Sequence, residues 1–331
     1  MKRLSLLSIA LACFCGLFAQ ERSNDVSRTL SFQLENDFRF SDRYYTNALK
    51  FNYTEAGDDW WASALQFAAL KIFADDASAQ YYQSASLGQE MYVGYDIKDP
   101  NPPLDDRPYA GWLYVSAGAH IATKNTLDSL SVSLGIVGPQ SFAEDAQKLH
   151  HSVIGADKPM GWHNQIKNEP GIIIAYKHSQ RLYEYALSDN FRTDFIGSLG
   201  ANLGNVNTEG RVHALWRIGF NMPYGFDATR MDSASSQDII WRGPKSENWH
   251  LYLYVGAIAR FVAYDITLDG NTFADSRSVD KKWLVGETNL GISARYKMTE
   301  LCLNWTVRTE DFNTQRAGAH MFWSASAKVH F

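Results

Sequence analysis

The segment 139–170 contains His150, His151 and Asp157, residues that could carry out acid–base chemistry. A segment this long between two expected strands is a common place for function. If residues 143–154 form a helix, the Asp157 carboxylate is near enough in sequence to orient the His151 imidazole. An imidazole held in this way is a general base that can take a proton from water. Spacing alone favours a simpler alternative, a polar surface helix that covers the end of the fold.

Oxygen-bearing side chains on two neighbouring segments form a second candidate site. Asp37 shares the parity of the polar residues around it, and so does Thr46 in the next predicted strand. Their oxygens, with carbonyls of the turn 39–44, could hold a hard cation such as Ca²⁺, which prefers oxygen ligands. One carboxylate and one hydroxyl also suit an ordinary solvated hairpin end, which spacing alone favours.

A third group of charged and aromatic residues includes the segment 94–109. Lys98 precedes a motif that runs from Asp106 to Trp112. The Lys98 ammonium could neutralise the phosphate of an anionic lipid. The alternative is plain surface charge, with the aromatic rings at a membrane interface.

The elements that must position these residues alternate in polarity with a period of two. In residues 320–331, one parity reads Met, Trp, Ala, Ala, Val and Phe, and the other reads His, Phe, Ser, Ser, Lys and His. A strand directs these two sets to opposite faces, one suited to lipid and the other to water. A terminal strand of this kind that ends on Phe331 is typical of an all-β protein, a transmembrane antiparallel β-barrel of a bacterial outer membrane.

Twelve segments are expected to be strands of about 9–11 residues. They are 27–38, 45–54, 84–93, 110–122, 129–138, 171–180, 192–202, 211–221, 249–261, 282–296, 300–310 and 318–331. An even number places both chain ends in the periplasm and the segments after odd-numbered strands outside the cell. All three candidate groups then lie at the outer rim, which favours one site facing the outer leaflet. Of the two long periplasmic segments, 55–83 and 222–248, the first contains the spacing of a helix at 58–74.

The composition fits this class of protein. The 331 residues have 14% aromatic and 20% charged side chains, and the net charge of −5 disfavours a nucleic-acid partner. A soluble β-sandwich would have a similar composition. Residues 1–19 are expected to be a signal peptide, although 11–13 also resemble a lipoprotein processing site. Residues 20–331 then form a single barrel domain whose one cysteine, Cys302, cannot form an internal disulfide.

The ordered motifs of the chain resemble those of the outer-membrane lipid A 3′-O-deacylase family. They are Glu35-Asn36-Asp37, Asp42-Arg43-Tyr44-Tyr45-Thr46-Asn47, Asp106-Arg107-Pro108-Tyr109-Ala110-Gly111-Trp112, His151-x-x-Ile154-Gly155-Ala156 and Gly161-Trp162-His163-Asn164-Gln165-Ile166-Lys167-Asn168-Glu169-Pro170. The similarity extends over nearly the whole mature chain. It implies a twelve-stranded barrel in a Gram-negative outer membrane that acts on lipid A of lipopolysaccharide. The implied activity is Ca²⁺-dependent hydrolysis of the ester that holds the 3′-linked acyloxyacyl chain.

The resemblance also implies roles for matched positions on the first two strands. Asp37 and Thr46 match residues at the metal, and Asn36 matches a residue that supports the metal or donates to the oxyanion. Bound Ca²⁺ would stabilise the negative charge that develops on the ester carbonyl.

On the catalytic side, His151 rather than His150 matches the family's histidine. Asp157 stands where the family has a glutamate, so its side chain is one methylene shorter. Lys98 aligns approximately with a basic residue, because the loop differs in length, and would bind a phosphate of the disaccharide.

Two other functions remain open from the sequence. One is an outer-membrane phospholipase with a Ser-His pair, although the chain lacks a Gly-x-Ser-x-Gly elbow. The other is a pore or structural barrel without activity, since twelve strands can leave a narrow lumen. The expected assembly is a monomer.

Overall fold

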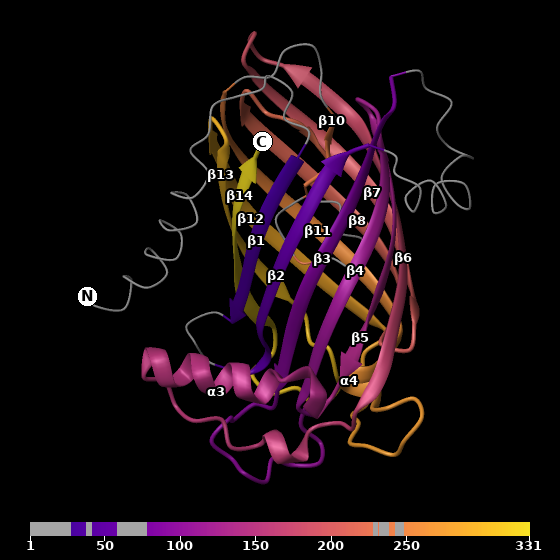
Figure 1. Cartoon of the computed structure of the whole chain (residues 1–331), viewed down its shortest axis with the longest axis vertical. Helices are drawn as coiled ribbons and strands as arrows, with labels where there is room; N and C mark the ends of the chain where they lie inside the picture. The colour runs from indigo at the N-terminus through magenta and orange to yellow at the C-terminus, as the bar shows by residue number, and fades with distance from the viewer. Residues whose placement is uncertain (1–27, 38–41, 58–77, 228–230, 232–237, 242–247) are drawn as a thin grey trace.

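The computed structural model describes residues 28–37, 42–57, 78–227, 231, 238–241 and 248–331. The long strands are β1 (Arg28–Asp37), β2 (Tyr44–Ala56), β3 (Gln80–Val93), β4 (Ala110–Ala122), β5 (Thr126–Val137), β6 (Glu169–Ala186), β7 (Phe191–Gly204), β8 (Asn207–Phe220), β11 (Trp249–Asp265), β12 (Leu284–Tyr296), β13 (Thr299–Arg308) and β14 (His320–His330). These twelve strands close an antiparallel barrel in the order β1-β14-β13-β12-β11-β8-β7-β6-β5-β4-β3-β2 (Figure 1). The shorter elements are β9 (Tyr224–Gly225) and β10 (Ile240–Trp241), which pair with each other, and the helices α3 (Ala143–Ile154) and α4 (Ile266–Asp269).

The closed twelve-stranded barrel confirms the fold class expected from the alternating pattern. The largest difference in strand length is in β6, which continues to Ala186 beyond the predicted range 171–180. The register shifts between Arg181 and Tyr183, and such a bulge interrupts the period-two pattern on which the prediction rested. The predicted helix at 58–74 and the predicted signal peptide at 1–19 lie outside the described residues. Within the described part of the chain, no helix is long and apolar enough to span a bilayer.

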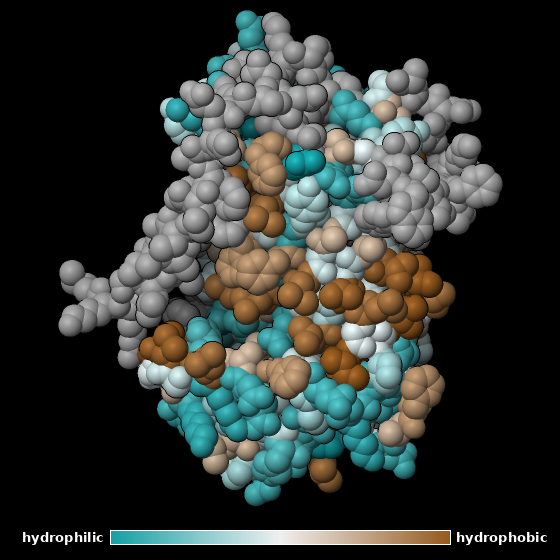
Figure 2. Space-filling view, viewed as in Figure 1, coloured by the Kyte–Doolittle hydropathy of each residue, from teal (hydrophilic) through white to brown (hydrophobic). Residues whose placement is uncertain are grey.

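The wall has one buried polar face and one exposed apolar face. On β14, His320 and Ser324 are buried, whereas Met321 between them is 42% exposed. Large hydrophobic side chains are exposed all around the barrel, and Figure 2 shows a hydrophobic band across the visible wall. The Arg28 amide donates to the Phe331 carbonyl at 2.9 Å, so β1 starts where β14 ends. Helix α3 lies at the opposite end of the barrel (Figure 1).

Described residues between β8 and β11 lie inside the barrel. The Asp238 carboxylate accepts hydrogen bonds from Ser31 of β1 and Asn52 of β2, both at 2.6 Å, and pairs with Lys328 of β14 at 3.1 Å. On the opposite side of the barrel, Arg181 of β6 donates to the Gly225 carbonyl at 3.2 Å. Gly225 and Asp238 are thus held against opposite walls of the lumen. A buried apolar cluster around it contains Met222, Phe226, Ile239, Leu215 and Tyr252.

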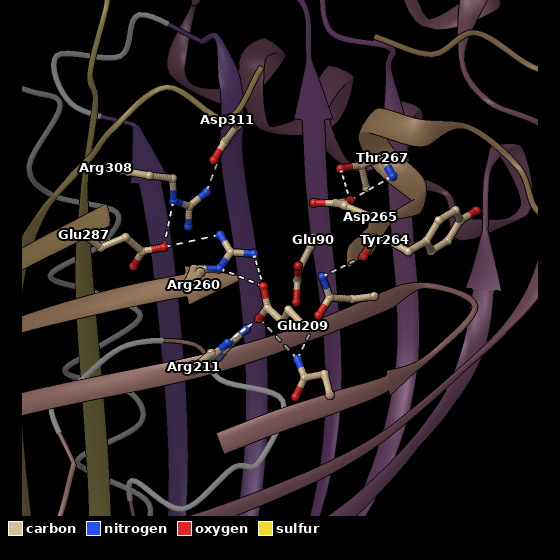
Figure 3. A network of polar contacts seen from close by, with 12 residues as sticks. Glu90, Glu209, Arg211, Arg260, Tyr264, Asp265, Thr267, Glu287, Arg308 and Asp311 are labelled. Carbon is tan, nitrogen blue, oxygen red and sulfur yellow. Dashed lines mark hydrogen bonds and ion pairs between the residues drawn. The ribbon is translucent and has the colours of Figure 1, made fainter. Parts of the chain in front are cut away.

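Ion pairs fill the lumen nearer the α3 end (Figure 3). Arg260 bonds Glu209 at 2.8 Å and Glu287 at 3.4 Å. Arg107 pairs with Asp311 at 3.1 Å. A cavity of about 80 Å³ remains among these side chains, which is space for only a few water molecules.

An occupied lumen predicts the behaviour of the protein in a planar bilayer. We expect no stepwise ion conductance from the purified protein, because the segment at Asp238 and the ion pairs obstruct the path. Single-channel recording tests this, with a known porin in the same bilayer as the positive control. Regular conductance steps from this chain would support the pore alternative.

Candidate active site

Helix α3 packs on the outer surface of the barrel wall. Its first residue, Ala143, clusters with Met91 and Val93 of β3. Leu87 has the same parity as these two strand residues and is 49% exposed, so this face of β3 points outward. A Cβ at Gly111 of β4 would lie 2.4 Å from the Ala143 Cβ. The glycine therefore allows the start of α3 to approach the wall.

The end of α3 brings His151 against the chain that follows it. Gly155 adopts the left-handed conformation with φ 68°, where glycine has no Cβ penalty. The Ala156 amide then donates to the His151 carbonyl at 3.0 Å, which satisfies an otherwise free helix end. This reversal places the Asp157 carbonyl beside the imidazole. Gly155 and Ala156 of the motif are thus structural residues that shape the site.

Both ring nitrogens of the buried His151 have partners. Nδ1 donates to the backbone carbonyl of Asp157. Because a carbonyl only accepts, this bond puts the proton on Nδ1 and leaves the Nε2 lone pair for proton transfer in the neutral ring. Nε2 lies 3.4 Å from Oδ1 of Asp42, and the Thr46 hydroxyl donates to the same oxygen at 3.3 Å. The contact with the Asp42 carboxylate raises the pKa of His151, since it stabilises the imidazolium.

Asp157 contacts His151 through a different atom from the one expected. The sequence suggested that its carboxylate orients the ring, whereas the backbone carbonyl does so. The Asp157 carboxylate instead pairs with the Lys98 Nζ at 2.8 Å, and both side chains are 64% exposed. This carboxylate raises the pKa of Lys98. The two residues form a charged edge of the site that is open to solvent.

Asn36 and Asp37 lie across the β1–β2 ladder from Thr46. Asn36 pairs in register with Asn47, and Asp37 is fully buried at the end of β1. The register of β2 shifts between Tyr45 and Asn47, so the parity of the strand does not fix the side on which Thr46 lies.

The residues at this point have the donor chemistry that Ca²⁺ requires. Asp37 offers a carboxylate, Thr46 a hydroxyl oxygen and Asn36 an amide oxygen, and hard cations favour such ligands. The Asn36 Oδ1 is buried without a hydrogen-bond partner among the described residues. No group of three or more His, Cys, Asp or Glu side chains gathers as metal ligands in the described ranges. Hydroxyl, amide and carbonyl oxygens would therefore have to complete a site here.

Sequence reasoning missed two residues that the structure brings to His151. Asp42 lies in a turn with no periodic pattern, and its contact with the ring depends on tertiary structure. Gln147 lies one helical turn before His151 and is buried on the same face of α3. Its Oε1 accepts from the Trp162 indole N–H at 2.7 Å, so its NH₂ group points away from Trp162 and has no described partner. The four-residue spacing from His151 was the available signal.

The motifs around Tyr109 and Trp162 support this helix. Their rings meet edge to face at 5.2 Å, and a Cβ at Gly161 would lie 2.6 Å from the Tyr109 ring. Trp162 in turn fixes Gln147. These motif residues hold α3 against the wall.

Comparisons with known proteins give the following matches. The family model described as outer membrane protein LpxR matches residues 4–331. The solved structure of LpxR from Salmonella typhimurium superposes with a TM-score of 0.75 at 20% identity, covering 92% of this chain and 100% of that one. The β-domain of the Bordetella autotransporter BrkA matches with a TM-score of 0.45 at 11% identity, covering 93% and 100% of the two chains. A search of curated proteins gave no match.

Proposed function

Because this chain belongs to the family of the outer membrane protein LpxR, an outer-membrane lipid A deacylase family, we propose that it removes the 3′-linked acyloxyacyl chain of lipid A through water activated by His151. The protein is an ester hydrolase of the Gram-negative outer membrane. What we propose beyond this activity is the 3′ position of the ester, the role of His151 as the base and the dependence on Ca²⁺. The observation that carries it is the buried imidazole with its two nitrogens set by Asp157 and Asp42.

His151 would act as the general base. With Nδ1 held by the Asp157 carbonyl, Nε2 takes a proton from water as the water oxygen attacks the ester carbonyl. Asp42 stabilises the imidazolium that forms. The tetrahedral intermediate then collapses, the 3′ oxygen of the sugar leaves, and His151 returns the proton to it. The products are a free hydroxyl on the disaccharide and a carboxylic acid.

Donors around His151 would orient the ester and balance its charge. The free NH₂ of Gln147 lies on the same helix face and is a candidate donor to the carbonyl oxygen. Asn36 would support the metal through its polar side chain. Lys98 would contact a phosphate of the lipid. Asp37 and Thr46 would hold Ca²⁺, which when bound supplies positive charge beside the developing oxyanion.

The Ser-His phospholipase alternative has less support. The two polar partners of the His151 ring are Asp157 and Asp42, and no serine of the described residues hydrogen-bonds to it. The neighbouring Ser152 hydroxyl donates to the Leu149 carbonyl instead. A serine-directed covalent inhibitor should therefore leave the activity unchanged, and inactivation would favour the phospholipase.

The two carboxylates near His151 predict different mutant behaviour. Asp42→Asn removes the charge that raises the pKa of His151, so the acid limb of kcat/KM should move to lower pH and the maximal rate should fall. The sign follows because a base with a lower pKa loses its proton at a lower pH. Asp157→Asn keeps the backbone carbonyl on Nδ1, so it should shift this limb less. A pH profile of both variants on purified lipid A checks this, and a larger shift in Asp157→Asn would contradict the assignment.

A further inference from the structure

A stripe of exposed apolar side chains runs along α3. Phe142, directly before the helix, is 60% exposed, and Leu149 and Val153 are 66% and 56% exposed. Spacings of seven and four residues put all three on one side of a helix with about 3.6 residues per turn. None of these side chains has a part in the proposed hydrolysis.

The stripe points away from the barrel wall. Gln147 and His151 are buried on the wall side, each two residues from Leu149. Residues two apart on a helix differ by about 200°, so the stripe lies opposite the catalytic face. Exposed polar residues, Asp145 and Ser152, lie beside the stripe. The helix thus has a catalytic face, a polar flank and an apolar outer face.

The apolar stripe is continuous with a lipid-facing part of the wall. Leu87, Val115 and Leu134 pair in one row across β3, β4 and β5 and are 49%, 58% and 53% exposed. Met91 and Gly111, where α3 packs, pair four residues further along these strands. This is about 13 Å along the strand, or less along the barrel axis because strands tilt. Figure 2 shows hydrophobic residues from the band on the wall to the level of α3.

We infer that α3 is an interfacial helix whose Phe142–Leu149–Val153 stripe contacts the acyl chains of the outer leaflet. Figure 1 shows that the helix lies across the barrel axis, the orientation of an amphipathic helix in the membrane plane. The neighbouring wall is in lipid, so the same lipid can cover the stripe. His151, on the opposite face of α3, then lies at the level of the membrane where the acyl chains of lipid A join the sugar. This inference concerns the position of the helix and does not depend on the proposed reaction.

Spin labelling measures this contact directly. Single cysteines are introduced as Leu149→Cys and Val153→Cys into a full chain whose native cysteines are replaced by alanine. The labelled protein is reconstituted into vesicles of phosphatidylethanolamine and phosphatidylglycerol. Collisions of the nitroxide with oxygen, which partitions into lipid, are compared with collisions with a water-soluble nickel chelate. Both labels should show severalfold fewer nickel collisions than a label at Ser152→Cys, the matched position on the polar flank.

A label at Leu134→Cys gives the value of the lipid-facing wall, and retarded gel mobility on heating confirms that each variant is folded. Labels at Leu149→Cys and Val153→Cys should resemble this wall label. Nickel access equal to that at Ser152→Cys would overturn the inference, because the stripe would then face water. Low access to both reagents with dipolar broadening between labels would also overturn it, since a second copy of the chain would then cover the stripe.

Discussion

His151→Ala should reduce lipid A hydrolysis by about 10²–10⁴-fold, the usual contribution of a general base. The side chain removed is buried between Asp42 and the Asp157 carbonyl, and no other described imidazole has both contacts. The barrel should remain folded, because α3 lies outside the sheet and the substitution suits a helix. The measurement is the rate of acyl release from purified lipid A, with gel mobility before and after heating as the test of folding.

His150 provides a matched control. It is the adjacent residue of the same helix, and its ring lies 6.0 Å from that of His151. Burial and the charge of His151 lower the pKa of His150. Among the described residues, the hydrogen bond to the Asp157 carbonyl comes from His151 and not from His150. His150→Ala should therefore keep most of the activity. Equal losses in both variants would indicate damage to α3, and full activity in His151→Ala would remove the proposed base.

Chelation should have the second large effect. EDTA should reduce hydrolysis to background, and added Ca²⁺ should restore it, because positive charge beside the ester oxygen would be lost and regained. Asp37→Asn, a nearly isosteric change at a fully buried carboxylate, should raise the Ca²⁺ concentration for half-maximal activity by about tenfold or more. Titration of activity with Ca²⁺ measures this shift.

Asp105→Asn is the control for that titration, since Asp105 is an exposed carboxylate on the β3–β4 loop. Its midpoint should match that of the unchanged protein. Activity that is indifferent to EDTA, or an unchanged midpoint in Asp37→Asn, would exclude the proposed ligand. These outcomes would leave the role of His151 to be judged from its own variants.

The barrel could be predicted because its signal is local. Outward and inward residues alternate along each strand, and this pattern alone identifies elements such as 320–331 and the face of each that meets lipid. Counting strands predicted that His151, Thr46 and Lys98 lie at the same end of the barrel. Their contacts through Asp42 and Asp157 confirm this. Helix α3 occupies residues 143–154, so the condition under which the sequence places Asp157 near His151 is met.

The finer structure of the site depends on contacts that residue types do not reveal. The partner of His151 Nδ1 is a backbone carbonyl, which every residue has, so the sequence drew attention to the Asp157 carboxylate. Asp42 is in a turn, where no periodic pattern predicts its contact with His151. The register of β2 shifts at Thr46, so the alternation along the strand does not predict the side on which Thr46 lies. The contact of Asp238 with Lys328 inside the barrel joins residues ninety positions apart.

The mass spectrum of lipid A shows whether this protein removes the 3′-linked acyloxyacyl chain through His151. Lipid A is extracted from Gram-negative cells that produce this protein, from cells that produce His151→Ala and from cells without either. We expect a species that has lost the 3′-linked acyloxyacyl chain only in cells with the unchanged protein, with fragmentation locating the loss at the 3′ position. The same lipid A in all three samples, when the protein is folded in the outer membrane and Ca²⁺ is supplied, would contradict it.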